Sequence, residues 1–170
     1  MRHADAWELD DRGGDMTGRA VIIHSLDHAR AALAAAERFG TPVTLYSAEG
    51  AAGYAGATWF LAVVAAARAD HPTATCEVVL DCGTAPGLAL AALRAGCRAI
   101  VIRGEPALLR KIAAIAAASS ARLDPGPREG LDLSRCPDPE AAVLAWLAPE
   151  AQRAANPARV APPARDERSD

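Results

Sequence analysis

Short apolar runs alternate with longer segments of helical period through the middle of the chain. The apolar runs show no alternation with polar residues, which is typical of strands buried on both faces. The first of them, AVIIH, is also rich in β-branched residues, which favour strands. The pattern predicts five strands, at 20–24, 42–46, 77–80, 99–102 and 121–123.

The segments between these runs place small apolar residues on one face and charged residues on the other, as amphipathic helices do. Pro86 suits the first position of a helix, and Gly40 and Gly96 suit helix exits. The pattern predicts helices at 27–39, 54–69, 86–95, 106–118 and 139–147.

Strands that alternate with helices of this length indicate right-handed βαβ crossovers and a parallel sheet. We therefore expect the α/β class, with about five parallel strands and alternating helices. Two architectures fit this pattern, a half-TIM-barrel-like sheet and a flavodoxin-like three-layer sandwich, and periodicity does not separate them. In both, ligands are expected at the carboxyl ends of the strands.

The periodic pattern is confined to the middle of the chain, so we predict a single α/β domain at 19–150. A polar arm at 1–18 precedes this domain and contains two consecutive glycines. A proline-rich tail at 151–170 follows it, and we expect this tail either to be mobile or to wrap a neighbouring subunit.

Composition narrows the class of protein. The 170 residues fit one domain, and 51% hydrophobic with 23% charged residues indicate a folded core. A net charge of −3 gives no basic surface for nucleic acid, so no nucleic-acid partner is expected. The first eighteen residues lack the apolar run of a signal peptide. Four cysteines without CxxC spacing favour reduced thiols in a cytoplasmic protein.

Two predicted helical segments, at 53–69 and 85–97, are almost free of charge. The first is interrupted by Gly53 and Gly56, so a membrane span is not expected. A small α/β domain normally exposes one face of each helix to water, whereas a helix that is apolar all round is buried. We therefore expect a second subunit to cover both helices, which predicts a homo-oligomer and most simply a dimer.

A family resemblance is carried by two stretches, DHARAALAAAERFGTPVTLYSAEGAAGYAG at 27–56 and VVLDCGTAPGLALAALRAGCRAIVIRG at 78–104. The region 25–104 resembles the first half of class II (zinc-dependent) fructose-bisphosphate aldolases. The resemblance covers about half of the chain, is specific at 47–56, and is generic in the third and fourth βα units. It implies the opening part of a (βα)8 barrel, although a whole barrel needs roughly 250 residues.

The departures from the family pattern concern zinc. The resemblance implies a proton-transferring aspartate at Asp81 and a zinc-binding histidine at the next position, where this chain has Cys82. A catalytic zinc needs three protein ligands, and no histidine follows His71. The resemblance therefore implies common ancestry and a pocket location, and we expect neither a metal nor another cofactor.

The segment from Asp81 to Thr84 carries the strongest candidates for chemistry, at the junction of a strand and a helix. Asp81 is a candidate for orienting a hydroxyl or moving a proton, and Cys82 for a thiolate near a helix start. Gly83 and Thr84 would contact a ligand there. The ordinary alternative is that Asp81 caps the helix and Cys82 packs in the core.

Other candidate ligand-binding residues follow the remaining strands. Ser25 ends the first strand and also suits a helix cap, and Ser47 and Glu49 follow the second. Arg103 ends the fourth strand, where a guanidinium can bind a phosphate or carboxylate. His24, on an apolar strand, is more typical of a core histidine than of a ligand.

These observations lead to one leading hypothesis. It is a small aldolase-related protein without zinc-dependent aldolase activity, which binds a small anionic or hydroxylated metabolite at the strand ends or serves as a structural or regulatory subunit. The alternative is a metal-free lyase or isomerase that uses Asp81 and Cys82.

Overall fold

The structure is a computed structural model that describes residues 18–155, with side chains for 18–149. The predicted arm at 1–18 therefore lies outside the described residues except for Gly18. Of the predicted tail, only 151–155 are described, and they continue the last helix.

Strands and helices alternate along the described chain. The strands are β1 (Arg19–Ile23), β2 (Val43–Ser47), β3 (Cys76–Asp81), β4 (Ala99–Val101), β5 (Arg122–Leu123) and β6 (Gly130–Asp132). The helices are α1 (Leu26–Phe39), α2 (Ala51–Tyr54), α3 (Ala57–Asp70), α4 (Pro86–Arg94), α5 (Pro106–Ala118) and α6 (Pro139–Ala155).

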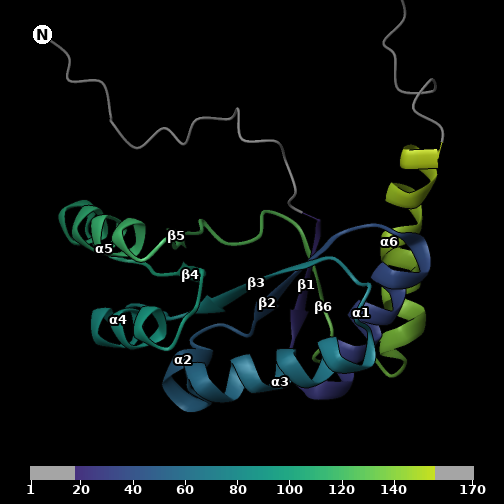
Figure 1. The fold of residues 1–170 in the computed structure, drawn as a ribbon, viewed down its shortest axis with the longest axis horizontal. Coiled ribbons are helices and arrows are strands. Elements are labelled where there is room, and N and C mark those ends of the chain that lie inside the picture. The colour runs from purple at the N-terminus through teal and green to yellow at the C-terminus, as the bar shows by residue number, and fades with distance from the viewer. Residues whose placement is uncertain (1–17, 156–170) are drawn as a thin grey trace, which may run out of the picture.

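All six strands pair in parallel in one sheet of order β5-β4-β3-β2-β1-β6. The first five strands lie in chain order, so each right-handed crossover places its helix on the same face of the sheet. Figure 1 shows the helices along one side and the β5–β6 connection on the other. The predicted α/β class is confirmed, and the strand order is that of a half barrel rather than of a sandwich, which has helices on both faces.

The sequence pattern missed β6. This strand has only three residues, Gly130–Asp132, and pairs with β1 so that Asp132 lies beside Ile22. A short segment with one apolar residue gives no periodic signal, and its pairing depends on a strand more than a hundred positions earlier. Because β6 lies at the opposite edge of the sheet from β5, the intervening connection must cross the sheet.

The helix predicted at 54–69 begins later in the structure and is preceded by a short helix that was not predicted. Its residues from Ala57 onward form α3, Tyr54 is the last residue of α2, and Gly56 lies between the two helices. Gly56 has φ 83° and ψ 154°, a conformation that is essentially restricted to glycine. The break turns the chain between the two helices above the carboxyl ends of the strands.

The sheet has a different environment on each face. The main core lies between the sheet and the helices and includes Val21, Leu45, Leu80 and Ile100. A smaller cluster on the opposite, inner face comprises Tyr46, Val79, Ala99 and Val101, with Ala20 and Ile22 packed against it. The β5–β6 connection reaches this face, because a Cβ on Gly126 would lie 4.0 Å from Val101 Cγ2. The chain thus partly covers its own inner face.

Across the described residues, no helix is both long and apolar enough to cross a membrane.

Candidate functional site

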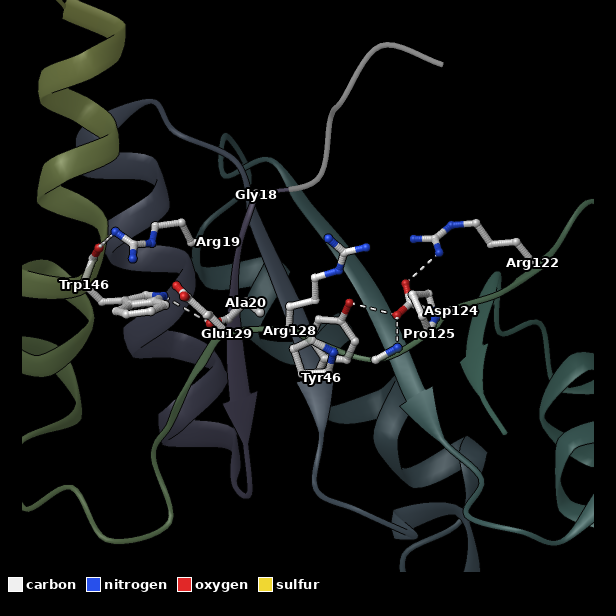
Figure 2. A pocket seen from close by; sticks show the side chains of 12 residues that line it. Gly18, Arg19, Ala20, Tyr46, Arg122, Asp124, Pro125, Arg128, Glu129 and Trp146 are labelled. Atoms are coloured by element: carbon white, nitrogen blue, oxygen red, sulfur yellow. Dashed lines mark hydrogen bonds and ion pairs between the residues drawn. The ribbon is translucent and has the colours of Figure 1, made fainter. Parts of the chain in front are cut away.

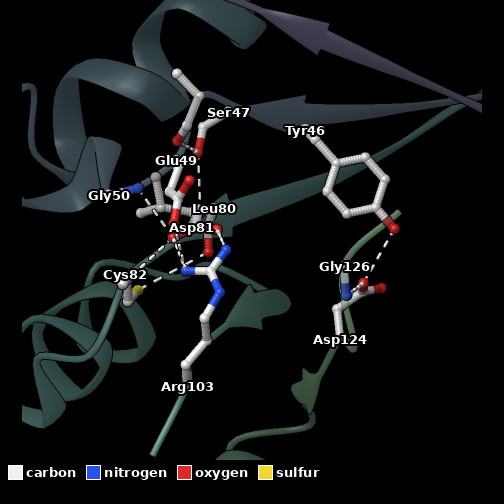
Figure 3. A network of polar contacts seen from close by, with 12 residues as sticks. Tyr46, Ser47, Glu49, Gly50, Leu80, Asp81, Cys82, Arg103, Asp124 and Gly126 are labelled. Carbon is white, nitrogen blue, oxygen red and sulfur yellow. Dashed lines mark hydrogen bonds and ion pairs between the residues drawn. The ribbon is translucent and has the colours of Figure 1, made fainter. Parts of the chain in front are cut away.

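The turns after β2, β3 and β4 lie side by side at the carboxyl edge of the sheet. They bring together four residues that the sequence indicated, which we call the rim cluster: Ser47, Glu49, Asp81 and Arg103. Figure 3 shows Asp81 in the middle, with the Arg103 guanidinium on one side and the Gly50 turn on the other.

Asp81 joins all three turns through its carboxylate. Its Oδ1 accepts hydrogen bonds from the backbone N–H of Gly50 at 2.9 Å and of Gly83 at 2.8 Å. Arg103 donates to both oxygens, from Nη1 to Oδ1 at 3.2 Å and from Nη2 to Oδ2 at 2.8 Å. With only 9% of its side chain exposed, Asp81 is surrounded by donors that hold the rim together.

Arg103 presents the exposed part of the rim cluster. Its side chain is 46% exposed, and Nη1 lies 3.5 Å from Oε1 of Glu49, whose side chain is 81% exposed. The hydrogen bond to Asp81 raises the pKa of Arg103 above its ordinary value, so the guanidinium stays charged. Because one arginine faces two carboxylates, the rim cluster carries a formal charge of −1.

Ser47 has a supporting position in this arrangement. It is buried, and its Oγ accepts from the backbone N–H of Asp81 at 2.9 Å and donates to the carbonyl of Ala48 at 3.0 Å. The hydroxyl therefore fixes the ends of β2 and β3 relative to each other.

Cys82 points into the main core on the helix side of the sheet. The residue is 1% exposed, and its Sγ lies 3.8 Å from the carbonyl oxygen of Leu80. Burial, followed by the neighbouring Cys97 and Asp81, raises the pKa of Cys82 to about 12, so the thiol is protonated at neutral pH. A catalytic role for Cys82 stays a prediction, and these surroundings favour packing.

Ser25 and Thr84 lie apart from the rim cluster. Ser25 is the N-cap of α1 and accepts from the backbone N–H of His28 at 3.2 Å. Thr84 is exposed in the turn before α4. Within the described part of the chain, neither is hydrogen-bonded to the cluster.

The residues at the family's zinc position do not fit a zinc site. The Asp81 oxygens are occupied by four donors, and the Cys82 sulfur faces the core. Among residues 18–149, no group of three or more histidine, cysteine, aspartate or glutamate side chains is placed to hold a metal ion. A zinc ligand set would require movement of both side chains.

A second polar network, on the inner face, was missed by the sequence pattern. Tyr46 donates to Oδ1 of Asp124 at 3.0 Å, and Arg122 donates to Asp124 at 2.6 Å and to Glu77 at 2.7 Å. Burial, followed by the charge of Asp124, raises the pKa of Tyr46 above its ordinary value. The signal in the sequence that could have indicated this network was Glu77, a charged residue beside a buried apolar run.

This network fixes the start of the β5–β6 connection against the sheet. Next to it lies a cavity of about 470 Å³, shown in Figure 2, between the connection and α6. In the lining of this cavity, Arg19 stacks on the Trp146 ring, with its guanidinium carbon 3.7 Å from the ring centroid. The indole of Trp146 in turn donates to the carbonyl of Ala20, so α6 is tied to β1.

Comparison with known proteins shows the fold and no more. No protein-family profile and no curated protein sequence matches the chain. A solved structure that does match is a candidate fructose-1,6-biphosphate aldolase from Coccidioides immitis, with a TM-score of 0.52 and 20% sequence identity. The match covers 63% of this chain and 44% of that chain, so the present chain spans less than half of the aldolase structure. The aldolase-like resemblance of the sequence is thus supported in the fold.

Proposed function

We propose that this protein is an aldolase-related half barrel that binds a small hydroxylated metabolite at its rim cluster and has no zinc-dependent aldolase activity. The observation that carries the proposal is the Asp81–Arg103 pair. Two parallel hydrogen bonds hold the guanidinium in one orientation, while almost half of the Arg103 side chain remains open to a ligand.

The charges of the rim cluster favour a neutral ligand over an anionic one. Arg103 is already neutralised by Asp81, and Glu49 adds an exposed negative charge 3.5 Å away. An incoming phosphate would meet this carboxylate, whereas a hydroxyl can donate to Glu49 and accept from Arg103. Of the two ligand classes expected from the sequence, the hydroxylated one therefore has the better support.

The test is a titration of the full chain with glycerol and, separately, with inorganic phosphate, followed by the backbone amide resonances of Gly50 and Gly83. Glycerol should give saturable shifts. Glu49→Gln should weaken binding about tenfold, as expected for the loss of a hydrogen bond to a charged group. Glu105→Gln, at an exposed glutamate outside the cluster, is the matched control and should bind normally.

Two results would contradict the proposal. One is saturable binding of phosphate without binding of glycerol. The other is equal affinity for glycerol in Glu49→Gln and Glu105→Gln. A metal-free lyase or isomerase that uses Asp81 and Cys82 has less support, because the Asp81 carboxylate already accepts four hydrogen bonds and Cys82 is buried as a thiol.

We also propose that the protein forms a homodimer through α3 and α4. The outer side of α3 carries an uncharged stripe at helical spacing, formed by Ala62, Ala65, Ala66 and Ala69, all exposed. Beside it, a mostly apolar groove of about 520 Å³ runs between α3, β3 and the turn before β4. Light scattering should give a mass near 35 kDa, twice the chain mass of 17.6 kDa, and Ala66→Glu should reduce it to the monomer value. A monomeric native protein would contradict this.

A reducing, cytoplasmic location is part of the same proposal. All four cysteines fall within the described residues and are free. Two of them, Cys82 and Cys97, are buried in the core, where a disulfide partner from another protein has no access.

A further inference from the structure

A histidine and an aspartate meet at the edge of the sheet formed by β1 and β6, away from the rim cluster. His24 directly follows β1, and Asp132 is the last residue of β6. Asp132 is in register with Ile22, so both of these side chains lie on the inner face, and His24 follows β1 at the carboxyl edge of the sheet. The Nε2 atom of His24 lies 2.7 Å from Oδ1 of Asp132.

The aspartate is held in its ionised form. Partial burial alone would raise the pKa of Asp132, but hydrogen bonds from the Ser134 backbone, at 2.8 Å, and from His24 outweigh burial and lower it. A carboxylate can only accept, so Nε2 of His24 donates to Asp132 and Nδ1 is the other polar atom of the ring. The His24 side chain is 30% exposed, which leaves it accessible.

Two residues of α1, His28 and Asp27, are the titratable and charged neighbours of this pair. From α1, His28 accepts from the His24 backbone N–H at 3.2 Å through its own Nδ1. Burial, and then the proximity of His24, lower the pKa of His28, so its ring is neutral. Asp27 is the other charged α1 residue near His28, and its side chain is 86% exposed.

His24 also lines a pocket of about 430 Å³ between the ends of β1 and β2 and the helices α2 and α3. Most of its lining is apolar, and the described residues around it include no aspartate, glutamate, lysine or arginine. Two aromatic side chains line it, Tyr54 with 71% exposure and Trp59 with 49%. The volume is in the range of small-molecule sites.

We propose that this pocket binds a small neutral phenol. The aromatic ring would pack against Trp59 and Tyr54, which exposes less apolar surface to water, and the phenolic hydroxyl would donate to Nδ1 of His24. Anionic ligands are disfavoured because the ionised Asp132 lies beside His24 and neither lysine nor arginine is among the described residues that line the pocket. The hydrogen bond from Nε2 to Asp132 fixes the orientation of the ring.

The experiment compares phenol with anisole, which has the same ring but a methylated oxygen and no donor. Binding is followed in the full chain by the ¹⁵N resonance of His24 Nδ1, which should shift with phenol and not with anisole. Phenol should bind about tenfold more tightly than anisole, and His24→Gln should remove that difference. His71→Gln is the matched control, because His71 pairs with Glu37 and does not line the pocket.

Equal binding of phenol and anisole by the native protein would overturn the proposal, and so would an Nδ1 resonance that phenol does not move. These readouts need no variant and therefore hold even if His24→Gln folds poorly. Ser47 is shared between this pocket and the rim cluster, whereas Glu49, Asp81 and Arg103 do not line the pocket.

Discussion

Three aspartates at strand ends make the same local bond. Asp81, Asp124 and Asp132 each accept a hydrogen bond through Oδ1 from the backbone N–H two positions later, at 2.8 Å in every case. These Asx-type turns follow β3, β5 and β6, and they use the short side chain to stabilise the exit from the strand. The side chain of an arginine or a histidine also hydrogen-bonds to each carboxylate. The aspartates are therefore primarily organisers of the carboxyl edge.

The reactivity of the cysteines tests the position of Cys82. Cys82 and Cys97 are buried and their pKa values are raised, whereas Cys76 and Cys136 are partly exposed. With a thiol reagent such as DTNB at pH 7.5, we expect two thiols to react rapidly and two slowly, with Cys82 among the slow ones. Mass mapping identifies the modified residues. If Cys82 reacted first, the alternative hypothesis of an enzyme that uses a Cys82 thiolate would gain support.

Tyr46 makes stability depend on pH in the alkaline range. Its pKa is raised from an ordinary value of 10.0, so the folded state prefers the neutral phenol. The resulting stabilisation is fully present below pH 10 and is lost as the pH rises through the folded pKa. At pH 8, Tyr46→Phe should lower the free energy of unfolding by about 1 kcal/mol through loss of one hydrogen bond.

As the pH rises above 10, the difference in unfolding free energy between the native protein and Tyr46→Phe should shrink. Urea unfolding at pH 8, 9.5 and 10.5 measures this difference. The contribution of the buried cysteines to the pH dependence cancels in the difference, because both proteins contain them. A constant difference across this range would mean that Tyr46 ionises as freely in the folded chain as in the unfolded one.

At the scale of elements, hydrophobic periodicity and helix-capping residues predicted most of the strands and helices. The first five strands and the helices α1, α3, α4, α5 and α6 were predicted because each has an apolar face and a recognisable end, such as Gly40 with φ 60° after α1, whereas the four-residue α2 was not. The strand β6 was missed because three residues carry no period, and the break at Gly56 was missed because glycine alone does not reveal its φ.

The same limits apply to the site. Ser47, Glu49, Asp81 and Arg103 were found because the ends of neighbouring parallel strands meet at one edge. The His24–Asp132 pair could not be found, since it requires the pairing of β6 with β1.

A pair of glycine substitutions tests the break between α2 and α3. Gly56→Ala should lower the unfolding free energy by roughly 1–3 kcal/mol, because an alanine at φ 83° and ψ 154° is strained even though no atom lies within 4 Å of its Cβ. Gly53 lies inside α2, and its Cβ would make an ordinary 3.5 Å contact with Leu88. Gly53→Ala should therefore be neutral or stabilising by up to about 1 kcal/mol. Equal effects of the two changes would contradict a break that depends on glycine.

For the whole molecule, strand order explains how so short a chain can have a barrel-like fold. Five strands in sequential order place the helices on one face, and the β5–β6 connection then crosses the inner face and ends in a sixth strand at the far edge. The barrel is not closed, but its inner face is partly covered by the connection and its polar network. The carboxyl edge remains open, and both proposed ligand sites lie there.

The central claim is that an aldolase-like fold is retained here without the zinc chemistry of the family it resembles. Asp81 accepts four hydrogen bonds and Cys82 faces the core, so a metal would bind them only after both side chains moved. The most direct test is the zinc content of the native full-length protein, purified without chelator and measured by atomic emission after dialysis. The account predicts far less than one zinc per chain. One zinc per chain that survives dialysis, and that is lost in Cys82→Ala, would contradict it.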